Sequence, residues 1–177
     1  MSGIRRVRVL VALLVRIAAG QQGPFQTVPP VESDSLRFGS LLAEFEAKDI
    51  SGRVWRTKDL RGKFTVIYVW HTFAARIPAP GLGKDIDEIQ RFYEKEVKGV
   101  QVLTFCRDYD YTHAGEYMKE RGYRFPAIAD WKVVDRLFPE TGTGTKWVVD
   151  PEGRVSYPFR AWTLGRVLYE VERLVRR

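Results

Sequence analysis

Cysteine is almost absent from this chain, which has a single one, Cys106, among its 177 residues. A lone cysteine cannot form an internal disulfide, so the core must be held together by packing even if the protein reaches an oxidising compartment. The same scarcity excludes a Cys-x-x-Cys pair, in which one thiolate attacks and a second thiol resolves the mixed disulfide.

Histidine is also scarce, because only His71 and His113 occur. No Cys, His and carboxylate residues cluster at the spacing typical of zinc ligands. We therefore expect no metal site, and no motif in the sequence indicates a cofactor. His113 is predicted to lie on a solvated helix.

The excess of positive charge is not concentrated in the expected domain. Residues 1–20 contain four arginines and no acidic residue, so without them the formal net charge falls from +7 to +3. The remaining lysines and arginines are scattered among Asp and Glu, whereas nucleic-acid binders cluster basic residues on one face. We expect no nucleic-acid partner.

No uninterrupted apolar run approaches the roughly 20 residues that a membrane span needs. The run 9–15 follows three arginines and precedes the small residues 18–20, which is the layout of a secretory signal. We predict a signal peptide at 1–20, a linker at 21–37 and one domain at 38–177. The protein is then periplasmic or extracellular, with no stable membrane span after cleavage. Because Arg16 interrupts the pattern, an uncleaved tail or a wrongly chosen start codon stays open as an alternative.

Strands and helices alternate along the expected domain. Residues 64–70 are β-branched or aromatic throughout, as in a strand covered on both faces. Residues 100–105 are predicted to form a second buried strand, which runs into Cys106. Periodicity and turn residues predict further elements: hairpins around Ser51-Gly52 and 150–153, a strand at 124–130, and helices at 84–97, 112–123, 131–138 and 163–175. This order predicts an α/β fold with a central mixed sheet flanked by helices.

Several stretches carry a family resemblance, in order and at family spacing: FEAKDISGRVWRTKDLRGKFTVIYVW, KGVQVLTFCRDYD, GYRFPAIAD and WVVDPEGRV. Together they resemble exported thioredoxin-like proteins of the TlpA or redoxin (AhpC/TSA-related) type, from about Phe38 to the C-terminus. The resemblance implies a thioredoxin-like fold with an N-terminal hairpin extension.

The family's redox motif, Trp-x-x-Trp-Cys-x-x-Cys, matches the stretch that begins at Trp70. With Trp70 and Phe73 on the aromatic positions, Ala74 and Ile77 stand where the cysteines belong. The family's cis-proline position falls at Gly144, where a cis bond is not expected. The resemblance thus implies a fold that has lost disulfide exchange and keeps Tyr68, Trp70 and Phe73 for packing.

The residues that follow the motif are expected to disrupt its helix. Pro78, Pro80, Gly81 and Gly83 disfavour a regular first turn, so we predict a remodelled loop and a helix that starts near Lys84.

Two residues after the central strands have a structural and a chemical interpretation. Cys106 is either a small buried hydrophobe, which we favour, or a lone redox thiol. His71 is either a polar residue bonded to backbone, which we favour, or an acid or base; no partner carboxylate is identifiable from the sequence. Asp108 and Asp110 are assigned to helix capping, with Thr112 as the cap of the next helix.

Two functional hypotheses remain. The first is a binding or scaffold module, not itself an enzyme, that takes a protein or peptide partner in a groove. The expected groove residues are Trp70, His71, Phe73, Ile77 and the 142–146 loop with Thr143 and Thr145. The second is a thiol-dependent oxidoreductase that works through Cys106, which requires an exposed thiol of lowered pKa.

Overall fold

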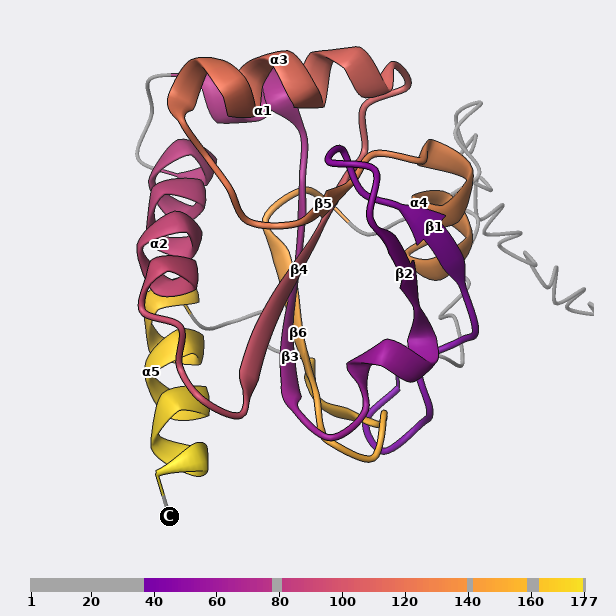
Figure 1. The fold of residues 1–177 in the computed structure, drawn as a ribbon, viewed down its shortest axis with the longest axis vertical. Helices are drawn as coiled ribbons and strands as arrows, with labels where there is room; N and C mark the ends of the chain where they lie inside the picture. The colour runs from indigo at the N-terminus through magenta and orange to yellow at the C-terminus, as the bar shows by residue number, and fades with distance from the viewer. Residues whose placement is uncertain (1–36, 78–80, 140–141, 159–162, 177) are drawn as a thin grey trace, which may run out of the picture.

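The computed structural model describes residues 37–77, 81–139, 142–158 and 163–176 (Figure 1). The predicted signal peptide, and the predicted linker up to residue 36, lie outside the described residues. Among the helices described, none is long and apolar enough to cross a bilayer.

A five-stranded mixed sheet forms the centre of the domain, in the order β5-β4-β3-β6-β7. Its strands are β3 (Phe64–Trp70), β4 (Val100–Cys106), β5 (Ala127–Ile128), β6 (Thr145–Val149) and β7 (Val155–Pro158). β3, β4 and β5 are parallel to one another, whereas β6 is antiparallel to β3 and β7 is antiparallel to β6. The predicted α/β class with a central mixed sheet is confirmed.

Elements on both faces bury this sheet (Figure 1). One face carries α1 (Thr72–Arg76), α2 (Leu82–Glu94), α3 (Tyr111–Arg121) and α5 (Leu164–Val175). The other carries the hairpin of β1 (Glu46–Lys48) and β2 (Val54–Arg56), the 3-10 turn η2 (Thr57–Leu60) and α4 (Trp131–Leu137). Val66 and Tyr68 of β3 point into the first core and Ile67 and Val69 into the second, which explains why the strand shows no polar alternation.

The segment after β3 differs from the expected remodelled loop. α1 forms a helical turn at 72–76, and α2 already begins at Leu82 with Gly83 inside it. A Cβ on Gly83 would lie 2.9 Å from the carbonyl oxygen of Ala75. Gly83 is therefore tolerated in the helix because it lets α2 approach the backbone of α1. Pro78 and Pro80 lie outside the described residues.

Two further expectations are corrected. The N-cap of α3 is Asp110 and not Thr112, since the Asp110 carboxylate accepts a hydrogen bond from the Thr112 N–H at 2.9 Å. β5 spans two residues instead of the expected 124–130. Pro126 immediately precedes β5 and has no N–H, so the hydrogen-bond ladder between β4 and β5 does not continue to the residues before Ala127.

Candidate functional site

α1 starts directly where β3 ends, so it occupies the place expected for a redox helix. His71 is its N-cap, Ala74 is half-buried within it, and Ile77 follows it with an extended backbone. Phe73 is 71% exposed and Ile77 is 46% exposed. The prediction that Phe73 serves packing is wrong, and this helix presents hydrocarbon where a thiolate would be needed.

Trp70, which we expected in a groove, belongs to the core. It is fully buried, its indole N–H donates to Thr104 Oγ1 at 3.1 Å, and its ring lies 5.8 Å from that of Tyr117. The side chain therefore lines no exposed groove. It fixes the end of β3 against α3.

The loop before β6 lies against the same end of β3. The Gly144 N–H donates to the carbonyl of Val69 at 2.7 Å, and Gly144 has a positive φ of 83°. All peptide bonds of the described residues are trans, including the one before Gly144. Thr143 and Thr145 are half-buried, and the Thr145 hydroxyl donates to the carbonyl of Gly142. The described part of this loop, 142–145, supplies backbone and hydroxyl groups beside the sheet edge.

Asp108 is the functional candidate that the sequence analysis missed. It is 2% exposed, and its carboxylate accepts from the Thr72 hydroxyl at 2.6 Å and the Thr72 N–H at 3.2 Å. It therefore caps α1 rather than α3. Because Trp70 and Cys106 are partners in the parallel ladder, the residues just after both strands meet at one edge. That shared edge is the signal that could have revealed the contact.

His71 has a carboxylate partner after all, since its Nδ1 lies 3.0 Å from Asp108 Oδ1. The Phe73 N–H also points at this nitrogen, at 3.1 Å. Nδ1 cannot donate to one group and accept from the other at once, and an unprotonated Nδ1 would place two acceptors side by side. The Phe73 hydrogen bond requires an unprotonated Nδ1 and an ion pair with Asp108 a protonated one, so the two belong to different protonation states of the imidazole. In both states Nε2 of the partly exposed ring is left for a ligand.

Cys106 ends β4 and is fully buried. Burial, and secondarily the charge of Asp108, raise the pKa of its thiol well above the ordinary value. A reactive cysteine needs the opposite, a thiolate that is exposed and stabilised. In this conformation Cys106 is a packing residue.

Large apolar side chains are exposed after each parallel strand of the sheet. Besides Phe73 and Ile77 they are Tyr109 (80% exposed), Tyr111 (71%) and Trp131 (39%). The rings of Tyr109 and Trp131 lie 5.9 Å apart. Exposed aromatic residues are characteristic of protein-binding surfaces. We call these five residues the aromatic edge.

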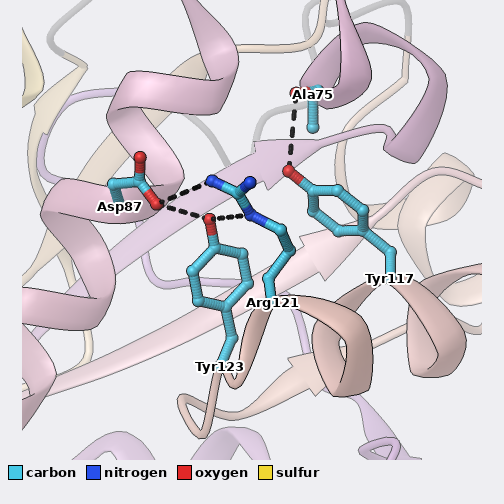
Figure 2. A network of polar contacts seen from close by, with 5 residues as sticks. All are labelled: Ala75, Asp87, Tyr117, Arg121 and Tyr123. Carbon is cyan, nitrogen blue, oxygen red and sulfur yellow. Dashed lines mark hydrogen bonds and ion pairs between the residues drawn. The ribbon is translucent and has the colours of Figure 1, made fainter.

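α1 is supported by contacts from α3, as Figure 2 shows. The Tyr117 hydroxyl donates to the Ala75 carbonyl at 3.4 Å, and the guanidinium of Arg76 lies 5.0 Å from the Tyr117 ring. The short helix that carries Phe73 of the aromatic edge is therefore braced by its neighbour. Within the described ranges, no three His, Cys, Asp or Glu side chains are arranged to hold a metal ion.

Comparison with known proteins identifies a family and several relatives. The model of the AhpC/TSA family matches residues 38–158. The thiol-disulfide oxidoreductase ResA of Geobacillus thermodenitrificans is 24% identical over 156 residues, which cover 86% of this chain and 84% of that protein. ResA of Bacillus thuringiensis is 23% identical and covers 84% of this chain and 83% of its own.

Solved structures give the same answer for the fold. The thioredoxin domain of a Bacteroides vulgatus thiol-disulfide oxidoreductase superposes with a TM-score of 0.64 at 19% identity, covering 79% of this chain and 99% of that one. A secreted thiol-disulfide isomerase from Corynebacterium glutamicum gives 0.62 at 20% identity, covering 77% and 86%.

Proposed function

Since this chain belongs to the AhpC/TSA family and has a thioredoxin-like fold, we propose that it is an exported binding domain that does not carry out thiol–disulfide exchange. Its relatives named above are thiol-disulfide oxidoreductases. The proposal therefore states that this member uses the family's sheet edge for binding.

One observation carries the proposal: Ala74 in α1 and Ile77 just after it stand where the family motif has sulfur, and the single thiol elsewhere is buried. Exchange needs a nucleophilic thiolate and a second thiol within reach. Neither Ala74 nor Ile77 can supply either, and a thiol with a raised pKa is a poor nucleophile.

The aromatic edge is the surface that we propose for binding. Its exposed rings can cover apolar side chains of a protein or peptide partner, and aromatic residues dominate the energetics of such contacts. His71 lies beside Phe73 and offers a polar group held in place by Asp108. Together they provide the apolar contact and the directional hydrogen bond that a peptide site requires.

A second candidate is a thiol-dependent oxidoreductase that uses Cys106, favoured by the activity of the relatives. This function requires β4 or α1 to move so that the thiol reaches solvent. It predicts activity that disappears in Cys106→Ser.

Reduction of insulin disulfides in the presence of dithiothreitol separates the two. We expect the purified protein to match the uncatalysed rate, and Cys106→Ser to behave identically. The variant Ala74→Cys with Ile77→Cys is the positive control, because it restores a thiol pair on α1. Turnover by the unmodified protein that is lost in Cys106→Ser would overturn the proposal in favour of the second candidate.

A further inference from the structure

β4 has an unpaired backbone edge on the side away from β3. β4 pairs with β5 only at Thr104 and Phe105, although it extends back to Val100. The Phe64 N–H donates to the Gly99 carbonyl, so Gln101 and every second residue after it bond to β3. Val100, Val102 and Thr104 therefore direct their backbone groups to the opposite side, where the Val100 N–H donates to the Val97 carbonyl at 3.0 Å.

Pro126 is the reason why this side is not filled by β5. Thr104 donates its N–H to the Pro126 carbonyl, and in a parallel ladder the next bond toward Val102 would need an N–H on residue 126. Proline has none. Within the part of the chain that the structure describes, no group hydrogen-bonds the N–H or C=O of Val102.

These unpaired groups border a groove of about 570 Å³. Val102 itself is only 3% exposed, so its unpaired N–H and C=O carry a desolvation cost that a hydrogen-bonding ligand removes. The groove also has apolar lining from five elements and connections: Ile50, Val97, Val100, Met118 and Phe125.

The groove wall is held in position by hydrogen bonds. The Tyr123 hydroxyl donates to Asp87 at 2.5 Å and accepts from Arg121 at 3.3 Å (Figure 2). Burial and the Asp87 contact raise the pKa of Tyr123, so it remains a neutral donor. The Arg124 N–H donates to the Gln90 side chain at 2.8 Å. These bonds fix Tyr123 and Arg124 to α2 and so hold this wall of the groove in place.

The charge along the groove is positive. Arg53, Lys63 and Lys119 line it, and none of them lies within ion-pair distance of a carboxylate among the described residues. The acids in its lining are Asp49 and Glu96. Asp49 is 6% exposed and already accepts from the Trp55 indole and the Ser51 hydroxyl. The Arg53 guanidinium stacks on the Trp55 ring at 4.2 Å, but none of the three cations has a carboxylate partner among the described residues, and this favours an acidic ligand.

We propose that this groove binds an extended acidic segment of a partner protein, which adds a short strand to β4. The segment's backbone bonds to the N–H and C=O of Val102, and its carboxylates lie near Arg53, Lys63 and Lys119. β-strand addition derives affinity from such backbone bonds and specificity from flanking side chains. The groove is separate from the aromatic edge, so this proposal holds whether or not the domain has lost thiol exchange.

Fluorescence polarisation with a fluorescein-labelled Glu-Val-Glu-Val-Glu peptide tests the proposal. N-methylation of alternate peptide residues removes only the N–H groups on one side of the strand. We therefore compare two peptides, one methylated at its odd-numbered and one at its even-numbered residues. Binding should be lost in the peptide whose methyl groups face β4 and kept in the other. We expect Lys63→Glu with Lys119→Glu to weaken binding at least about tenfold, with a smaller salt dependence. Lys58→Glu with Lys132→Glu, which changes charge equally outside the groove, is the matched control.

Amide hydrogen exchange of Val102 locates the peptide. Its exchange should slow on binding, while that of Val66, already inside the sheet, should not change. Equal binding of a Gln-Val-Gln-Val-Gln peptide would overturn the acidic partner. Failure to bind, equal losses in the two charge-reversal variants, or unchanged exchange at Val102 would overturn the site.

Discussion

Asp108→Ala gives the sharpest test of how the candidate site is held together. The substitution removes a carboxylate that is 2% exposed and that binds two donors of Thr72 and the imidazole of His71. Thr72 is itself 6% exposed, so its hydroxyl and N–H lose their acceptor in a place where water replaces it poorly. The structure thus predicts a cost well above that of an average surface substitution.

The magnitude follows from these contacts. A hydrogen bond to a charged group contributes roughly 1.5–3 kcal/mol net, and a buried donor left unpaired costs about 1–3 kcal/mol. Because the contacts share one carboxylate they do not add fully, and we expect a loss of about 3–4 kcal/mol in the free energy of unfolding. For a chain of this size that corresponds to a melting temperature lower by about 10 °C.

Urea denaturation followed by tryptophan fluorescence measures this loss. Asp110→Ala is the matched control, two residues away: it removes an exposed cap of α3 and should cost clearly less. Asp108→Asn keeps the shape and should fall between the two. A loss below about 1 kcal/mol for Asp108→Ala would refute the assignment of Asp108 as the buried acceptor at α1.

Three further predictions concern stability and the redox positions. Since burial raises the pKa of Cys106, the unfolded chain releases the thiol proton at a lower pH than the folded protein does. The free energy of unfolding should therefore be unaffected below about pH 8.5 and fall above it by up to about 1.4 kcal/mol per pH unit. Cys106→Ala should remove this slope in urea titrations from pH 8 to 10. Gly83→Ala should destabilise by about 1–3 kcal/mol because its Cβ meets the Ala75 carbonyl, whereas Gly115→Ala, which meets nothing within 4 Å, should stabilise α3 by up to about 1 kcal/mol; equal effects would contradict the packing of α1 on α2. Ala74→Cys with Ile77→Cys should form an intramolecular disulfide on mild oxidation, measured by mass after alkylation; no disulfide would mean that α1 is not a helical turn in solution.

The strands of the central sheet could be predicted because burial on both faces leaves a direct trace in composition. β3 is a continuous β-branched or aromatic run and β4 is apolar apart from Gln101 and Thr104, and their observed bounds match the expected ones closely. The caps were harder. Asp108 and Asp110 are two residues apart and chemically identical, yet one caps α1 across the sheet edge and the other caps α3 locally.

The site could be predicted only in part, because its key contacts depend on register between strands. The contact of His71 with Asp108 joins residues that are far apart in sequence, and it exists because Trp70 pairs with Cys106. Helix propensity alone predicts that Gly83 breaks the helix, because it does not reveal that the Ala75 carbonyl leaves no space for a Cβ at this position. The unpaired groups of Val102 in β4 likewise follow from one residue, Pro126, which lies just before β5.

The rate of alkylation of Cys106 by iodoacetamide, measured by mass spectrometry across pH 6–9.5 in native and urea-denatured protein, decides whether this thiol is a packing residue or a redox group. The structure predicts slow labelling of the native protein throughout this range and fast labelling after denaturation, because the thiol is buried and its pKa is raised. Fast native labelling with a midpoint below the free-thiol value of about 8.5 would contradict the account and restore Cys106 as a redox thiol.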